Sequence, residues 1–153
     1  MSYATTAYFG VNSFKFVNEK GAVTIGRYQL IPDAGRHFLS TDEIAKVAAN
    51  YLEDEIRQRV VHGAVRFKVV LQLAAPGDKI DDPSVAWAST NEITMLGTLT
   101  VASVVPDSEA TERALMFLPA LLPAGIEPAD PMIQFRNKTY PVSYEGRQSS
   151  SGA

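Results

Sequence analysis

The order of hydrophobic and polar residues in the first part of the chain alternates, which predicts two paired β-strands. Residues 13–17 alternate between polar and apolar side chains, and residues 23–31 alternate again. Residues 18–21, Asn-Glu-Lys-Gly, have the composition of a tight turn. The pattern therefore predicts a β-hairpin with half-buried strands.

The spacing of apolar residues changes after residue 40 and predicts helix. Ser40 and Glu43 match a capping box, in which each side chain bonds the backbone amide of the other residue. Apolar side chains then recur every three or four positions up to Val60, and Gly63 is suited to end a helix. Asn50 interrupts this pattern, so one long helix and two short helices both fit.

Two further strands are predicted, at residues 65–73 and 93–105, and Gly97 is expected at a bulge or bend. About four strands with separate helical segments define an α+β fold class. Four antiparallel strands leave two open edges, and open edges tend to pair with other strands. We expect these edges to be covered by a second copy of the chain, by a partner chain, or by the other half of the same barrel.

The last part of the sequence predicts helices that are separated by an irregular segment. Asp107 is expected to cap a short helix. Residues 117–128, which include three prolines, predict an ordered loop or a few turns. The Asp-Pro pair at 130–131 favours the start of a final helix, which Pro141 should end or kink. The tail at residues 148–153 is rich in Ser, Gly and Ala and is expected to be disordered.

Composition narrows the possible functions. The 153 residues are 46% hydrophobic and 20% charged, which is typical of one globular domain with a core. The net charge of -3 argues against a nucleic-acid-binding protein, and the absence of cysteine excludes disulfides and thiolate chemistry. The amino terminus lacks the pattern of a signal peptide, and no apolar stretch has the length of a membrane span, so we expect no membrane partner.

The most informative residues for chemistry lie in the predicted final helix. Met132, Arg136 and Tyr140 are spaced four residues apart, which places them on one helical face. An arginine near a phenol favours the phenolate form. Tyrosinate is a known axial ligand of haem iron. The Arg-x-x-x-Tyr spacing by itself also fits an ordinary surface pair.

Other candidate sites have simpler explanations. His37 and His62 could form a metal pair, but a predicted helix separates them, and solvated surface histidines explain them better. The acidic residues at 78–82 lack the spacing of a calcium loop, and those at 53–55 fit an exposed helix face.

Several segments together resemble the catalase superfamily, and the resemblance runs from about residue 3 to residue 147. Residues 117–119, 123–128 and 132–140 resemble the proximal haem region of catalases, and residues 8–18 resemble another catalase segment. Residues 71–74 and 104–110 look most similar to the small catalase-related peroxidases. The chain thus resembles the C-terminal half of a catalase-like antiparallel β-barrel, with a domain at 1–147 and the tail at 148–153.

The resemblance implies a haem b cofactor and a role for each matching residue. Tyr140 would be the axial ligand of the haem iron, and Arg136 would hold Tyr140 as phenolate. Arg147 would bind a haem propionate, with Tyr144 standing where catalases often have histidine. The apolar contacts on the proximal haem face would come from Met132, Phe117 and Pro119.

The activity implied by the resemblance is the haem-dependent breakdown of hydrogen or organic peroxides with a small organic electron donor, and this chain would supply the proximal side. The family's distal histidine and asparagine are expected to lie outside this chain. Two alternatives stay open: a non-enzymatic remnant that binds haem, and an interaction module that pairs with another chain. We expect a cytoplasmic location, with the periplasm left open.

Overall fold

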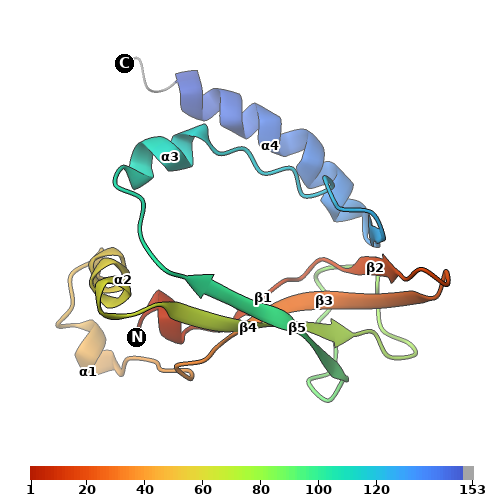
Figure 1. The fold of residues 1–153 in the computed structure, drawn as a ribbon, viewed down its shortest axis with the longest axis horizontal. Helices are drawn as coiled ribbons and strands as arrows, with labels where there is room; N and C mark the ends of the chain where they lie inside the picture. Colours follow the sequence, from red (N-terminus) through yellow and green to blue (C-terminus); the bar gives the residue numbers. More distant parts are fainter. Residues whose placement is uncertain (150–153) are drawn as a thin grey trace. The chain divides into compact units, whose positions relative to one another are not determined.

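The computed structural model describes residues 1–149, and Figure 1 shows its helices and strands. In chain order they are the 3-10 helix η1 (Tyr3–Thr5), β1 (Tyr8–Phe9), β2 (Phe14–Val17), β3 (Val23–Pro32), α1 (Thr41–Ile44), α2 (Tyr51–His62), β4 (Val65–Leu73), β5 (Ile93–Val101), α3 (Ser108–Ala114), β6 (Ile126–Pro128) and α4 (Pro131–Ser149).

The six strands form one sheet in the order β5-β4-β3-β2-β6, and β1 pairs with β3. The described chain divides into two compact units, and β3, β4 and β5 contribute residues to both. Unit 1 comprises residues 1–9, 28–71 and 94–104, and unit 2 comprises residues 10–27, 72–93 and those from 105 onward. The α+β class is confirmed, but the sheet has six strands where the sequence predicts about four.

The predicted hairpin is confirmed in unit 2. Strands β2 and β3 pair antiparallel with Phe14 opposite Gly26, and the Asn18 side chain accepts hydrogen bonds from two backbone amides of the turn, both at 3.0 Å. Strand β6 then pairs antiparallel with β2, within the segment predicted as a loop. A strand of three residues that ends in proline has too short a pattern to be recognised from sequence.

The two-helix alternative is correct for the segment after residue 40. Ser40 N donates to Glu43 Oε2 at 2.8 Å and Glu43 N donates to Ser40 Oγ at 3.4 Å, which confirms the capping box of α1. Asn50 is the residue before α2, and Gly63 ends α2 by donating its amide to Arg59 O at 3.2 Å. The interruption at Asn50 in the sequence therefore marks a true break.

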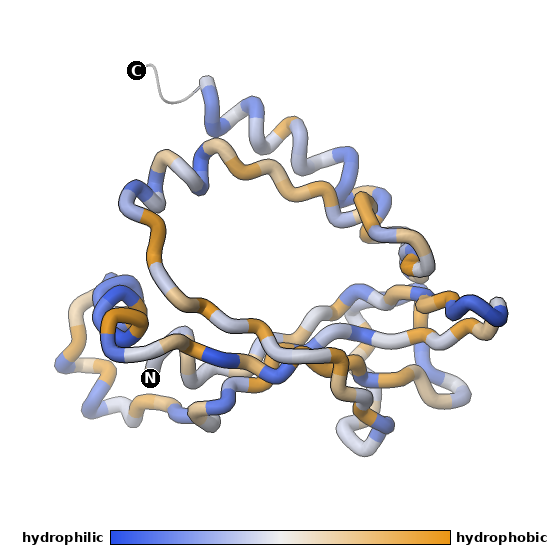
Figure 2. Tube along the Cα trace, in the orientation of Figure 1, coloured by the Kyte–Doolittle hydropathy of each residue, from blue (hydrophilic) through white to orange (hydrophobic). Residues whose placement is uncertain are grey.

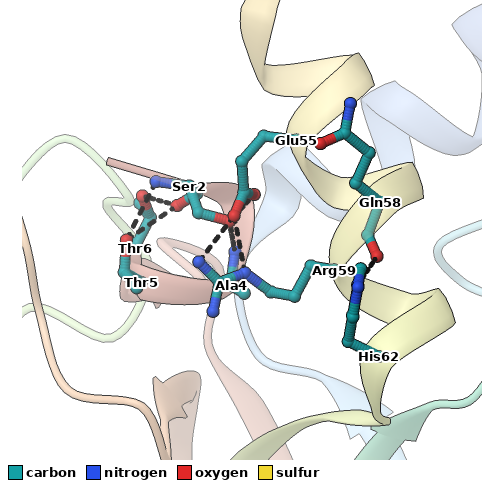
Figure 3. A network of polar contacts seen from close by, with 8 residues as sticks. All are labelled: Ser2, Ala4, Thr5, Thr6, Glu55, Gln58, Arg59 and His62. Carbon is teal, nitrogen blue, oxygen red and sulfur yellow. Dashed lines mark hydrogen bonds and ion pairs between the residues drawn. The ribbon is translucent and has the colours of Figure 1, made fainter.

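The core of unit 1 forms where the amino terminus, α2 and β4 meet. Its buried members are Ala4, Val60, Val65 and Phe67, with Leu30, Ile56, Val101 and Val104 packed against them. Figure 3 shows how polar contacts tie the amino terminus to α2: Ser2 Oγ donates to Glu55, and Arg59 Nε donates to the same carboxylate at 2.6 Å. Helix η1 is thus held by tertiary contacts that a local sequence pattern does not reveal.

Glu55 makes the stability of unit 1 depend on pH. Burial by itself would raise the pKa of Glu55, but the hydrogen bonds from Arg59 and Ser2 and the charge of Arg59 outweigh burial and lower this pKa. A carboxyl whose pKa is lowered by folding stabilises the protein above its unfolded pKa, about 4.3, and loses this contribution as the pH falls through the folded pKa. We therefore expect the melting temperature to fall below about pH 4.3, and to fall less steeply in Glu55→Gln.

Thermal melts of both proteins from neutral pH down to pH 3 would measure this difference. Glu53→Gln, on the first turn of the same helix, is the control and should follow the parent protein. Parallel pH profiles of the parent and Glu55→Gln would contradict the expectation.

Unit 2 ends in two helices that begin where the sequence predicts. Asp107 Oδ1 accepts a hydrogen bond from Ala110 N at 2.9 Å and caps α3, and α4 starts at Pro131. Of the two effects expected of Pro141, an end or a kink, the end is excluded, because α4 continues to Ser149. Residues 148 and 149 are therefore helical, and the rest of the tail lies outside the described residues.

Tertiary contacts explain why α4 continues beyond Pro141. A proline inside a helix removes one backbone hydrogen bond and clashes with the preceding turn. Past that point, Arg147 Nη2 donates to Leu115 O at 3.0 Å and Gln148 Nε2 donates to Arg113 O at 2.7 Å. These bonds hold the last turns of α4 against α3 and the segment after it. Within residues 1–149, no helix combines the length and apolar character needed to cross a membrane.

Candidate functional site

The helix α4 carries most of the candidate residues, and its first turn is held by Asp130. This carboxylate is 3% exposed and accepts hydrogen bonds from Met132 N at 2.9 Å and Ile133 N at 3.3 Å, as a helix cap does. It also accepts from Ser13 N at 2.9 Å and from Asn12 Nδ2 at 3.1 Å. Asp130 therefore attaches the start of α4 to the segment that leads into β2.

Arg136 joins the same network from the second turn of α4. Its Nη1 donates to Asn12 Oδ1 at 2.9 Å, while the amide of Asn12 donates to Asp130. Asn12 thus connects the cation of Arg136 with the buried carboxylate of Asp130 through one side chain that uses both its donor and its acceptor. This arrangement fixes the position of the Arg136 guanidinium along the helix.

Tyr140 lies one turn further along α4, beside a pocket of about 170 Å³ in unit 2. The residues that line this pocket are Met116, Phe117, Tyr140, Ser143 and Arg147. Arg147 is oriented by the backbone carbonyl of Leu115 and by Ser143 Oγ, to which its Nη1 donates at 3.3 Å. The pocket therefore combines a phenol, an oriented cation and two apolar side chains.

Met116 and Phe117 line the pocket from the segment after α3, and Figure 2 shows the segment 115–122 as mostly hydrophobic. It is fixed along α4 by a hydrogen bond from Ala120 N to Asn137 Oδ1 at 3.1 Å. Phe117 on this segment is 69% exposed and Tyr140 is 36% exposed. Exposed apolar side chains next to a pocket are typical of a surface that binds an apolar ligand or another protein.

The structure brings together three of the residues singled out in the sequence, namely Phe117, Tyr140 and Arg147. Met132, Pro119 and Arg136 are not among the residues that line this pocket, and the guanidinium of Arg136 bonds Asn12. Sequence reasoning missed Asn12, Met116 and Ser143 as members of the site. Ser143 follows Tyr140 by three positions on the helix, a spacing that indicates the same face.

The donor set of the pocket fits a haem that rests against α4. A phenol oxygen can bind ferric iron, a guanidinium can bind a carboxylate, and Met116 and Phe117 supply an apolar surface. The volume is smaller than the roughly 300–1,000 Å³ of pockets that enclose a whole ligand. The described residues would therefore contact one side of such a group.

Comparison with known proteins identifies the family. A family model described as catalase matches residues 1–151. The chain is 36% identical over 147 residues to a catalase-related peroxidase of Synechococcus elongatus, covering 95% of this chain and 43% of that protein. It is also 36% identical to a catalase-related peroxidase of Mycolicibacterium paratuberculosis, covering 95% of this chain and 47% of that protein.

The fold agrees with this match. The structure superposes on the crystal structure of a fungal catalase with a TM-score of 0.83 and 20% identity, covering 95% of this chain and 32% of that one. The chain belongs to the catalase family. It spans less than half the length of the two catalase-related peroxidases that it matches.

Proposed function

We propose that this chain forms the proximal side of a haem b site in a peroxide-degrading enzyme, with residues 1–147 as its catalase-like domain. The observation that carries the proposal is the pocket beside α4, where Tyr140, Phe117 and Arg147 meet. The resemblance in sequence implies a role for each of them. Tyr140 would be the axial ligand, Phe117 an apolar contact and Arg147 a propionate contact. Haem would supply a redox-active iron that reacts with peroxide.

The residues of this chain would bind and orient that group. The Tyr140 oxygen would ligate the iron, and ligation requires that the phenol lose its proton. Arg136, to which the resemblance assigns the support of this ligand, would act from a position set by Asn12 and Asp130. Arg147, held by the Leu115 carbonyl, would pair with a carboxylate at the edge of the group.

The apolar residues would exclude water from the proximal face. Phe117 and Met116 lie at the pocket, and Met132 and Pro119 would extend this apolar surface. Loss of water strengthens the bond between an anionic oxygen and the iron, because the effective dielectric constant falls. Hydrogen or organic peroxides would be the oxidising substrates, and a small organic molecule would be the electron donor.

Haemin titration followed by absorption spectroscopy tests this proposal. The parent chain is expected to give a saturable spectrum typical of tyrosinate-bound ferric haem. Tyr140→Phe removes the ligand oxygen with little change in shape, so we expect the characteristic spectrum to disappear and the affinity to fall by roughly tenfold or more. Tyr51→Phe, on α2 in unit 1, is the matched control and should bind as the parent does.

Peroxide consumption by the haemin-loaded chain, with an organic electron donor present, separates the enzyme from its alternative. Turnover that depends on Tyr140 would support the proposed enzyme. Specific binding without turnover would favour a haem-binding module instead. Binding that is unchanged in Tyr140→Phe would contradict the proximal site itself.

A further inference from the structure

A second pocket of unit 2 lies between the short helix α3 and the last turns of α4. Its volume is about 480 Å³, and it is lined by Asp107, by four residues of α3, and by Tyr144 and Gln148 of α4. Sites that hold a small molecule have volumes of roughly 300–1,000 Å³. The two helices therefore enclose a space of the size that a small ligand needs.

Hydrogen bonds hold the walls of this pocket in place. Gln148 Nε2 donates to the backbone carbonyl of Arg113 at 2.7 Å and so joins the end of α4 to α3. Asp107 Oδ1 accepts from Ala110 N at 2.9 Å, which fixes the carboxylate at the start of α3. A pocket that is formed before its ligand arrives loses little conformational entropy on binding, which favours affinity.

The pocket adjoins the proposed haem site through one pair of side chains. The guanidinium carbon of Arg147 lies 5.7 Å from the centre of the Tyr144 ring, which is a cation–π contact. Arg147 lines the pocket that contains Tyr140, and Tyr144 lines the pocket beside α3. The two pockets are thus neighbours along α4, and the Arg147–Tyr144 pair lies between them.

The polar groups of the pocket favour a ligand that donates hydrogen bonds and carries no negative charge. Glu109 and Arg113 neutralise each other in an ion pair at 2.7 Å, so the lining residues retain the single negative charge of Asp107. Asp107 uses Oδ1 for the cap of α3, and its Oδ2 can accept a further bond. Gln148 uses its Nε2, and its Oε1 is a second acceptor.

The apolar part of the lining suits a flat ring. It consists of the methyl groups of Ala110 and Ala114 and the ring of Tyr144. Aromatic rings pack favourably against one another, in offset or edge-to-face geometry. A ring with two hydroxyl groups would therefore pack against Tyr144 while its hydroxyls donate to the free acceptors.

We propose, building on the haem site proposed above, that the pocket between α3 and α4 binds the organic electron donor, and that this donor is an uncharged aromatic diol. The reaction balances with this donor. Oxidation of the diol to the quinone releases two electrons and two protons, and together these reduce one hydrogen peroxide to two waters. The Arg147–Tyr144 pair places the bound diol next to the haem site.

Amide chemical shifts of the isotope-labelled chain locate this site in the absence of haem. The probe is catechol, titrated under nitrogen. We expect saturable shifts at Ala110, Ala114 and Gln148, and none in unit 1. Salicylate, in which a carboxylate replaces one hydroxyl of the same ring, should bind roughly tenfold more weakly or worse, because its charge is opposed by Asp107.

Two variants and a matched control test the assignment of the lining residues. Asp107→Asn removes the charged acceptor but can still cap α3, and should raise the dissociation constant for catechol by roughly tenfold. Ala110→Leu fills the pocket from an exposed helical position and should abolish the shifts. Glu112→Gln removes an equal charge from α3, outside the pocket lining, and should bind catechol as the parent does.

Three results would overturn the donor site. The first is a set of catechol shifts spread over both units. The second is equal affinity of Asp107→Asn and Glu112→Gln for catechol. The third is salicylate that binds as tightly as catechol.

The haemin-loaded chain separates failure of the donor site from failure of the haem site. Asp107→Asn should raise the KM for catechol roughly tenfold with an unchanged haemin spectrum, whereas Tyr140→Phe should lose the spectrum and keep the catechol shifts. A parent chain that binds haemin through Tyr140 but gives no catechol shifts would overturn the donor site alone. Catechol shifts in a chain that binds no haemin would overturn the proposed function, and with it the role of the diol as donor.

Discussion

Asp130→Ala is expected to lower the free energy of unfolding by about 3–4 kcal/mol. The substitution removes the cap of α4 and the acceptor for the buried donors of Asn12 and Ser13. Those donors would stay buried without a partner, which costs more than the loss of an exposed hydrogen bond. For a domain of this size the melting temperature should fall by roughly 10 °C.

Loss of the Asp130 carboxylate should also weaken the proposed haem site. Without the carboxylate, Asn12 loses one of its two partners, and Arg136 loses the support that orients it. We therefore expect weaker haemin binding by Asp130→Ala at temperatures where the chain is still folded. Asp33→Ala removes an exposed carboxylate and serves as the control, with unfolding and binding like the parent. A melting temperature of Asp130→Ala within a degree or two of the parent would contradict the role assigned to Asp130.

Arg27→Ala is the second substitution with a large expected effect, a loss of about 3 kcal/mol in unfolding free energy. The Arg27 side chain is 5% exposed and donates to the carbonyls of Val85 at 2.8 Å, Asp82 at 3.1 Å and Lys79 at 3.3 Å. Its guanidinium also lies 4.1 Å from the centre of the Trp87 ring. One side chain thus organises the connection between β4 and β5.

The electrostatics of Arg27 explain why its contacts matter. Burial lowers the pKa of Arg27, while the carboxylates of Asp130, Asp78 and Asp82 partly offset this effect. Its buried Nε has no hydrogen-bond partner among the described residues, so the other nitrogens must compensate for desolvation. Arg27→Lys should recover little of the lost stability, because an ammonium cannot reproduce the planar fork that reaches three carbonyls.

Urea unfolding, followed by the fluorescence of the single tryptophan, measures this effect locally. Trp87 should become more exposed in Arg27→Ala, with its emission shifted to longer wavelength. Arg66→Ala, an exposed position on β4, is the control and should unfold as the parent does. An unchanged midpoint and emission in Arg27→Ala would show that the loop is held by other contacts.

Local chemistry explains which elements were predictable. A capping box needs only two residues three positions apart, so the sequence alone predicts the one formed by Ser40 and Glu43. The β2–β3 hairpin and the start of α4 at Pro131 depend on neighbouring residues in the same way. The family resemblance likewise rested on short ordered motifs, and it led to Tyr140, Phe117 and Arg147, which line one pocket.

The remaining features depend on residues far apart in the chain. Strand β6 forms only because β2 offers it an edge, and α4 passes Pro141 because α3 and the segment after it hold its last turns. The bond between Arg136 and Asn12 joins residues 124 positions apart, so no local pattern could indicate it. The helical spacing predicts that Arg136 and Tyr140 share a face of α4, and the tertiary structure adds the bond from the Arg136 guanidinium to Asn12.

The sequence by itself determined the α+β class, the main helices and strands, the family and the candidate ligand Tyr140, because these depend on propensity, periodicity and short motifs. Only the tertiary structure decided the six-strand sheet, the Asp130–Asn12–Arg136 network and the members of the pocket beside α4. The physical reason is that buried polar groups must find partners wherever the fold places them, and that placement is a property of the whole chain.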